Sequence, residues 1–284
     1  MTLKKYSDNY SRVYVEVTNA CNKSCSFCPK HERELRMMTV DEFDLVTSKL
    51  IGVTEYLYYH VMGEPLTHPH ITELIKIASD KGFKSVITTN GSLLDILGDK
   101  LIASGVYKIN LSIHSFEGNS LEEHKKYMDT CFDFADKASR EGILIILRLW
   151  NSGHDNGLND QTLEILRERF ADGEWKTVAN GARIRHKLHL EYGERFSWPD
   201  MASEEVDDSV FCYGLNDHFS VLCDGTVVPC CLDRNGDISL GNIYEQDICE
   251  ILCSPLAEQI RNGFAEHVAT QELCRRCGYA KRFK

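Results

Sequence analysis

The sequence has no excess of basic residues. Lysine and arginine together number 32 against 43 aspartates and glutamates, which gives a formal net charge of -11. A protein that binds a nucleic-acid backbone needs basic groups to neutralise the phosphates. The composition therefore makes nucleic acid an unlikely partner on charge grounds.

Long apolar runs are also missing. No stretch approaches the roughly 20 apolar residues of a transmembrane helix, and the first eight residues lack the apolar core of a signal peptide. Low-complexity tracts and repeats of solenoid length are absent too. These absences predict an ordinary globular protein of the cytoplasm with no membrane contact.

Cysteine, in contrast, is abundant, with twelve in the chain. A reducing cytoplasm does not maintain structural disulfides, and a chain of 284 residues can build a core without them. Most of the cysteines are therefore predicted to bind metal. Those without a partner at ligand spacing are predicted to be free thiols in apolar surroundings: Cys131, Cys223, Cys249 and Cys253.

Short β-rich runs alternate with longer helical patterns, which indicates parallel βα units. The expected strands are 13–18, 56–61, 85–89, 108–113, 144–150 and 183–192, and the expected helices are 39–50, 71–81, 93–104, 121–141 and 158–170. Further along, a hairpin of 219–222 and 226–230 precedes a helix at 248–262. The pattern predicts an α/β fold: a partial (β/α)6 barrel over residues 1–206 and a small C-terminal domain, a β-hairpin plus helix, over 207–284.

Three cysteines lie within eight residues, directly after the first expected strand: Cys21, Cys25 and Cys28. Three thiolates on a four-iron cluster leave one iron without a protein ligand. The amino and carboxylate groups of S-adenosylmethionine can chelate such an iron. The alternative is a zinc site completed by His31, since thiolates and imidazole also suit zinc.

This spacing resembles the motif of the radical S-adenosylmethionine superfamily, in which an aromatic residue such as Phe27 usually precedes the third cysteine. The segment 62–65 is similar to the family's Gly-Gly-Glu-Pro segment, with Met62 in place of the first glycine. The ends of the third and fourth strands lie where the family contacts the ribose and the methionine carboxylate. The resemblance implies these cofactor-binding residues: Phe27, Gly63, Glu64, Pro65, Thr89, Asn90 and Ser112.

A second set of cysteines, Cys212, Cys230, Cys274 and Cys277, resembles the shortened SPASM domain known as a twitch domain. The resemblance implies one auxiliary [4Fe-4S] cluster, and hence two [4Fe-4S] clusters in all. Four thiolates leave no open iron, so electron transfer is expected there. Cys231 could replace Cys230 as the ligand, but only one of the two can serve, because hairpin alternation places them on opposite faces. A structural zinc ribbon is the other interpretation of the same spacing.

Polar residues on the sixth strand are predicted to face the barrel cavity. Arg185, Lys187, His189 and Glu191 alternate with a mainly apolar face, and Asn110, Ser112 and His114 of the fourth strand would point the same way. Taken singly, each is better explained as a salt-bridged or solvated side chain, whereas the group suggests a polar, hydroxylated or anionic substrate. The candidate catalytic residues are His114, Arg148, Glu191 and Arg195. Arg195, which follows the sixth strand, is included because the resemblance to the cyclitol-oxidising relatives implies an arginine near the substrate there.

Chain size and auxiliary-cysteine spacing resemble the deoxy-scyllo-inosamine dehydrogenases, which oxidise a cyclitol alcohol. The resemblance implies an oxidoreductase in which a 5'-deoxyadenosyl radical abstracts hydrogen from a carbohydrate or cyclitol, with flavodoxin or ferredoxin as electron donor. One alternative is modification of a ribosomally made peptide by thioether formation, crosslinking or epimerisation, although only twenty residues precede Cys21. The other is a zinc-stabilised binding module without catalysis.

Overall fold

The structure is a computed structural model that describes residues 10–116, 120–154, 158–206 and 209–283. Residue contacts divide the chain into two compact units. Unit 1 contains residues 1–22, 29–84 and 196–284, and unit 2 contains residues 23–28 and 85–195. The predicted domain boundary, between residues 206 and 207, falls beside residues outside the described ranges and stays a prediction.

Unit 1 joins the first two βα units of the chain to its C-terminal part. Its strands are β1 (Arg12–Val15), β2 (Tyr56–Tyr58), β9 (His218–Val221), β10 (Thr226–Val228) and β11 (Gly241–Asn242). Its α-helices are α1 (Val40–Lys49), α2 (Ile71–Asp80), α6 (Ile248–Leu252), α7 (Pro255–Ala265) and α8 (Glu272–Arg275), with 3-10 helices η1 (Pro65–Thr67) and η3 (Gly278–Phe283).

Parallel pairing extends from the N-terminal strands of unit 1 into the C-terminal hairpin. Strand β1 pairs in parallel with β2 on one edge and with β9 on the other, while β10 runs antiparallel to β9 and to β11. Val13 and Val15 of β1 are fully buried and alternate with half-buried Arg12 and Tyr14. This period of two gives β1 one apolar and one polar face.

Unit 2 contains the remaining βα units. Its strands are β3 (Lys84–Thr89), β4 (Lys108–Ser112), β5 (Leu144–Ser152), β6 (Lys176–Val178), β7 (Gly181–Arg185) and β8 (Leu188–Glu194). Its helices are α3 (Leu94–Ala103), η2 (Ile113–Ser115), α4 (Leu121–Arg140) and α5 (Leu158–Arg169). Strands β3, β4, β5 and β8 are parallel in that order, and β8, β7 and β6 follow antiparallel.

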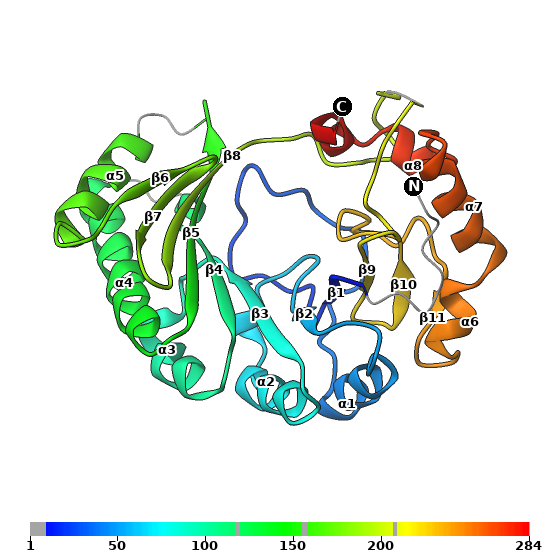
Figure 1. The fold of residues 1–284 in the computed structure, drawn as a ribbon, viewed down its shortest axis with the longest axis horizontal. Coiled ribbons are helices and arrows are strands. Elements are labelled where there is room, and N and C mark those ends of the chain that lie inside the picture. The colour runs from blue at the N-terminus through cyan, green and yellow to red at the C-terminus, as the bar shows by residue number, and fades with distance from the viewer. Residues whose placement is uncertain (1–9, 117–119, 155–157, 207–208, 284) are drawn as a thin grey trace. The chain divides into compact units, whose positions relative to one another are not determined.

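The five helices predicted from periodicity are confirmed within one or two residues at each end. Helix α1 begins with a capping box: the Thr39 hydroxyl accepts a hydrogen bond from the backbone of Glu42, whose carboxylate accepts one from Thr39. Helix α4 buries Met128, Phe132 and Ala135 at helical spacing. In Figure 1, α3 and α4 lie along the same side of β4 and β5. The α/β class with parallel βα units is therefore confirmed.

The predicted strand 183–192 is wrong as a single strand. The chain turns at His186 and Lys187, so β7 and β8 form an antiparallel hairpin, and Lys187 has a φ of 62°. Its sequence lacks the Asn-Gly or Gly-Gly pair that typically marks a two-residue turn. The alternation assumed across residues 183–192 therefore breaks at the turn.

Two C-terminal expectations also need correction. Strand β10 ends at Val228, before Cys230, so strand alternation does not decide between Cys230 and Cys231. The predicted helix 248–262 is two helices, because Ser254 caps a new helix with Pro255 in its first turn. Among the described residues, no helix has the length and apolar character needed to cross a membrane.

Candidate active site

The first cysteine loop leaves β1 and spans both units. Cys21 and Cys28 are exposed and Cys25 is half-buried. The backbone N–H of Cys28 donates to the carbonyl of Cys25 at 3.1 Å, which makes a tight turn. Exposed thiols on a loop fit a cluster whose remaining iron must stay open to a small molecule.

The segment Met62 to Pro65 is held against the loop that leads to Cys21. Gly63 has a φ of 76°, and a Cβ there would lie 2.4 Å from the carbonyl oxygen of Thr18. The N–H of Glu64 donates to the carbonyl of Ala20 at 2.9 Å. Only glycine fits at position 63. Met62 does not have a positive φ, so its backbone accepts a side chain where the family pattern has glycine.

Glu64 is almost fully buried, and its carboxylate accepts a hydrogen bond from the N–H of Leu66 at 3.1 Å. This bond caps η1, which starts at Pro65. The carboxylate is thus oriented by local structure before any ligand binds.

In unit 2, Tyr127 of α4 connects the ends of β3 and β4. Its hydroxyl donates to the carbonyl of Asn90 at 2.6 Å and lies 3.4 Å from that of Ser112. The Thr89 hydroxyl accepts from the N–H of Gly91, and the Asn90 side chain accepts from Ser92. Thr89 and Asn90 therefore shape a turn, as the local sequence alone predicts.

The same tyrosine also contacts the cysteine loop. The Lys23 ammonium lies 4.7 Å from the centre of the Tyr127 ring and donates to the carbonyl of Ser115 at 3.0 Å. A cation over an aromatic face is stabilised by the ring's electrons. Tyr127 thus links residues 23–28 with the strand ends that carry Asn90 and Ser112.

The four candidate catalytic residues lie close together in unit 2. Arg148 and Glu191 are paired across β5 and β8, with the Arg148 Nε 4.0 Å from the Glu191 carboxylate. The Trp150 indole N–H donates to that carboxylate at 3.0 Å, and the Arg148 guanidinium lies 4.5 Å from the Trp150 ring. Glu191 is therefore held by an aromatic donor beside a cation.

His114 lies just after β4, in the same group of side chains as Arg148 and Glu191. Its Nδ1 is 2.9 Å from the carbonyl oxygen of Arg148, to which a protonated Nδ1 donates. Burial lowers the pKa of His114 to about 4, and the charges of Arg148 and Arg195 lower it further against the opposing effect of the backbone hydrogen bond. The imidazole is therefore neutral near pH 7, with Nε2 able to accept a proton or hydrogen bond.

Phe27 and Arg195 complete this group of side chains around His114. The Phe27 ring lies 5.2 Å from that of His114, and the Arg195 guanidinium lies 5.3 Å from the Phe27 ring. Gly193 allows Trp150 to lie against the backbone of β8, because a Cβ there would be 2.8 Å from the indole. The aromatic of the cysteine motif thus touches two predicted catalytic residues.

Other members of the predicted polar row lie elsewhere. Arg185 pairs with Asp136 of α4 at 2.7 Å and so faces the helix, whereas Lys187 occupies the turn. Asn110 is fully buried and donates to the Thr88 hydroxyl. The turn at 186–187 explains why Arg185 and Glu191 face opposite sides.

In unit 1, the four predicted auxiliary cysteines converge. Burial raises the pKa of the Cys230 thiol well above its usual value, and the nearby thiols raise it further: Cys231, Cys212, Cys274 and Cys277. Burial and neighbouring thiols raise the pKa of Cys212 to about 11 and raise that of Cys274 as well. Four mutually close thiols need positive charge to ionise, which fits a site built for iron.

Cys231 has different surroundings. Burial raises the pKa of its thiol to about 11, against the effect of a hydrogen bond from Tyr14 and the charge of Arg12. The Tyr14 ring packs edge-on against His60 and His218 at 5.5 and 5.6 Å. The Cys231 thiol therefore has a partner on β1.

The cysteines predicted to be free divide into two groups. Cys131 and Cys223 are buried, as expected, but Cys249 is half-buried and Cys253 is exposed. Cys249 lies in α6 and Cys253 caps its C-terminal end, so apolar neighbours in the sequence did not place these two side chains in the core.

Within the described residues, no three His, Cys, Asp or Glu side chains are arranged to hold a single metal ion. A four-iron cluster spaces its thiolates farther apart than one ion does. A cavity of about 520 Å³ in unit 2 contains no predicted catalytic residue; it is lined by Arg167, Ala171, Trp175, Thr177, Gly181, Ala182 and Tyr192.

Three residues that contact the site were missed from the sequence: Tyr127, Trp150 and Glu16. The buried Glu16 carboxylate accepts a hydrogen bond from the N–H of Met62. Trp150 ends an apolar run and Tyr127 lies in an amphipathic helix, so both resemble core residues. A signal for Glu16 did exist, since a carboxylate directly after a buried strand must have a polar partner.

Comparison with known families gives two matches. The model of the radical SAM superfamily matches residues 15–172, and that of the SPASM iron-sulfur cluster-binding domain matches residues 212–278. Among curated relatives, the GTP 3',8-cyclase of Chlorobaculum tepidum is 38% identical over 111 residues, which are 37% of this chain and only 33% of the relative. The probable GTP 3',8-cyclase of Sulfurisphaera tokodaii is 30% identical over 310 aligned residues, 95% of this chain and 96% of the relative.

Solved structures show the same fold. BtrN in complex with AdoMet (S-adenosylmethionine) and 2-DOIA has a TM-score of 0.63 at 17% identity, covering 95% of this chain and 94% of BtrN. Native anSMEcpe with bound AdoMet and Cp18Cys peptide has a TM-score of 0.58 at 14% identity, covering 94% and 88%. Together with the two cysteine sets, these matches imply an AdoMet-binding [4Fe-4S] cluster and an auxiliary cluster. The chain belongs to the radical SAM superfamily and carries a C-terminal SPASM domain of the twitch type.

Proposed function

We propose that the chain oxidises a hydroxyl group of a carbohydrate or cyclitol to a ketone. The observation that carries the proposal is the convergence of four thiols in the SPASM domain: Cys212, Cys230, Cys274 and Cys277. Four thiolates occupy every iron of a [4Fe-4S] cluster, which leaves it able to accept an electron and unable to bind a substrate.

In this assignment, Cys21, Cys25 and Cys28 hold the first cluster, and Cys230 is preferred to Cys231 in the second. Cys230 is close to all three other auxiliary thiols as well as to Cys231. Cys231 is close to Cys277, but its thiol accepts a hydrogen bond from Tyr14. AdoMet is assigned to these residues: Phe27, Gly63, Glu64, Pro65, Thr89, Asn90 and Ser112. A reduced flavodoxin or ferredoxin is the proposed electron donor.

When bound, the first cluster and AdoMet supply a 5'-deoxyadenosyl radical that removes one hydrogen atom from a substrate carbon. Oxidation of an alcohol to a ketone then requires the loss of one proton and one electron. Glu191 is the proposed proton acceptor, because the Trp150 indole orients its carboxylate. Arg148, beside that carboxylate, is placed to stabilise negative charge on the substrate oxygen, with His114 and Arg195 as its neighbours.

Cyclisation of a guanine nucleotide is a second candidate. The similarity to the Sulfurisphaera protein, named as a probable GTP 3',8-cyclase, over nearly the whole of both chains supports it. Cyclisation gives no net oxidation of the substrate, so it does not need an electron acceptor with four thiolates. Peptide modification is a third candidate, supported by the fold shared with the peptide-bound anSMEcpe.

The test is an anaerobic assay of the reconstituted enzyme with AdoMet, a reductant and three substrate panels: cyclitols and sugars, GTP, and cysteine-containing peptides. We expect one methionine, one 5'-deoxyadenosine and one ketone, lighter than its alcohol by two hydrogens, per turnover. A product with the mass of GTP or a crosslinked peptide would contradict the proposal and identify the alternative.

With the alcohol identified, Glu191→Gln should lower ketone formation by about 100-fold, the size of a general-base effect, while AdoMet cleavage continues. Glu168→Gln, on the exposed side of α5 in the same unit, is the matched control and should behave as wild type. Equal losses of AdoMet cleavage and ketone in Glu191→Gln would show that Glu191 is not the base.

A further inference from the structure

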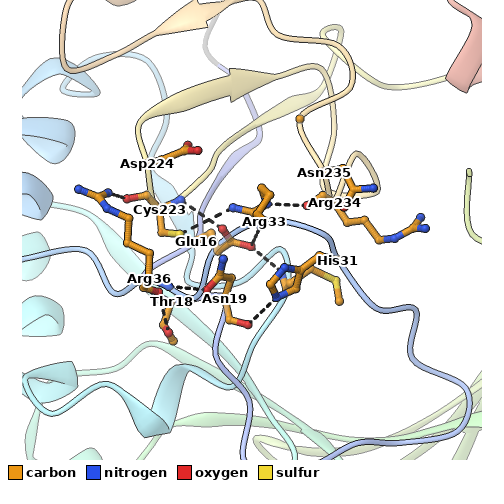
Figure 2. Close-up of polar contacts among 12 residues, drawn as sticks. Glu16, Thr18, Asn19, His31, Arg33, Arg36, Cys223, Asp224, Arg234 and Asn235 are labelled. Carbon is orange, nitrogen blue, oxygen red and sulfur yellow. Dashed lines mark hydrogen bonds and ion pairs between the residues drawn. The ribbon is translucent and has the colours of Figure 1, made fainter. Parts of the chain in front are cut away.

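A single buried carboxylate connects four segments of unit 1. Glu16, the residue after β1, is fully buried. Its Oε1 accepts a hydrogen bond from the N–H of Met62 at 3.0 Å, and its Oε2 accepts one from the N–H of Cys223 at 3.1 Å. Its third partner is the Arg33 guanidinium at 2.7 Å, and Figure 2 shows Glu16 between Arg33 and Cys223.

Arg33 extends these contacts into the SPASM domain. Its Nε donates to the carbonyl of Arg234 at 2.8 Å, and its Nη1 lies 3.7 Å from the Cys223 sulfur. The Arg33 side chain is 12% exposed, so both members of the ion pair are shielded from water. Breaking one partner of such a pair leaves an uncompensated buried charge.

Further hydrogen bonds hold the chain around Arg33, which follows the first cysteine loop. Asn19 donates to the carbonyl of Glu34 and accepts from the N–H of Arg36, and the Thr18 hydroxyl donates to the carbonyl of Arg36. Figure 2 shows Arg36, Asn19 and Thr18 side by side. The Asn235 side chain accepts from the N–H of Glu32 at 3.1 Å.

These contacts converge beside the segment assigned to AdoMet. The Met62 amide held by Glu16 directly precedes Gly63, whose position against Thr18 leaves no room for a Cβ. The segment is therefore fixed at two adjacent residues, by a carboxylate on one and by close backbone packing on the next. A binding loop that is ordered beforehand loses less conformational entropy when its ligand binds.

We propose that Glu16 is a positioning residue for AdoMet. Its carboxylate orders the segment Met62 to Pro65 and ties it to the turn at Cys223 in the SPASM domain. Arg33 supplies the positive charge that pairs with this carboxylate. The proposal rests on the assignment of Gly63 to Pro65 to AdoMet in the proposed function, and it is independent of the substrate.

The experiment compares three variants of the reconstituted protein. Glu16→Met removes both acceptors. Glu16→Gln retains one side-chain oxygen, which should accept from the Met62 N–H and from Arg33. Its NH2 group then faces the Cys223 N–H, which loses its acceptor. The double variant Glu16→Met/Arg33→Met removes both charges, so it restores stability while the Met62 amide stays without its acceptor.

Two readouts are measured without substrate: AdoMet affinity by equilibrium dialysis, and hydrogen exchange of the peptide that contains Met62. A buried amide N–H without an acceptor is costly, so the loop should lose its order. We expect about tenfold weaker AdoMet binding and faster exchange of the Met62 amide, both in Glu16→Met and in the double variant. Glu16→Gln should keep near-wild-type AdoMet affinity and exchange faster only at Cys223. Rescue by this conservative variant distinguishes positioning from general destabilisation.

Two further variants separate the possible failures. Asp136→Asn breaks the half-buried pair with Arg185 in unit 2 and should leave AdoMet affinity unchanged. Glu64→Gln tests the assigned segment itself. If Glu64→Gln binds AdoMet normally, the assignment in the proposed function is wrong. If Glu64→Gln binds weakly but the double variant binds as wild type, Glu16 has no positioning role.

Discussion

At the residue scale, burial changes the chemistry of individual side chains. His114 is held by the Arg148 carbonyl and shielded beside Phe27, and burial keeps its pKa at about 4. The unfolded chain has an ordinary histidine pKa near 6.5. As the pH falls from about 6.5 to 4, the unfolded state takes up a proton that the folded state does not. His114 therefore destabilises the fold in acid and has no such effect above pH 7.

We predict that His114→Asn makes folding stability less sensitive to pH. The asparagine amide can still donate to the Arg148 carbonyl but does not titrate. Wild type should lose on the order of 2–3 kcal/mol more than the variant between pH 7.5 and 4.5. The measurement is urea unfolding of both proteins at both pH values. Subtracting the variant's loss of unfolding free energy from that of wild type removes the contribution of the other titrating groups. Identical losses would mean that His114 titrates normally in the folded state.

At the element scale, the hairpin of β7 and β8 decides which side chains face the proposed catalytic residues. Because the chain turns at Lys187, Glu191 lies beside Arg148 and Trp150, whereas Arg185 contacts α4. The turn places a lysine at a φ of 62°, where a Cβ is unfavourable. The hairpin thus has a strained residue at its tip.

Lys187→Gly should relieve this strain. We expect the free energy of unfolding to rise by about 0.5–1 kcal/mol, since glycine adopts positive φ freely but also gains entropy in the unfolded chain. Lys187→Ala, which keeps a Cβ, is the matched control and should give no increase. Thermal unfolding of the two variants beside wild type measures the difference. A glycine variant less stable than the alanine variant would contradict the observed turn.

At the scale of the whole molecule, the two cysteine sets predict two independent clusters. Reconstituted wild type should hold about eight irons per chain, and Cys21→Ala/Cys25→Ala/Cys28→Ala should hold about four and no longer cleave AdoMet. Iron analysis and visible absorbance measure the content, and 5'-deoxyadenosine release measures cleavage. Stoichiometric zinc, or cleavage by the triple variant, would overturn the ligand assignment.

Much of this protein could be predicted from local sequence. The spacing of Cys21, Cys25 and Cys28 suggested the family, which the comparisons confirm, and helical periodicity located α1 to α5. The capping box at Thr39 is equally local, since its two residues are three apart. Each of these signals depends on residues a few positions apart, whose contacts are fixed by local backbone geometry.

The remaining features depend on contacts between distant residues. Glu16 meets Met62 and Cys223 across 46 and 207 residues of sequence, and Trp150 meets Glu191 across 41. Those contacts follow from strand order and register, which cannot be predicted from the residue pattern of a single segment. The turn at Lys187 has the same origin: the pairing of β5 with β8 holds a lysine where local preference would choose glycine. Sequence alone therefore determined the family and the helices, while the tertiary structure decided which polar side chains meet.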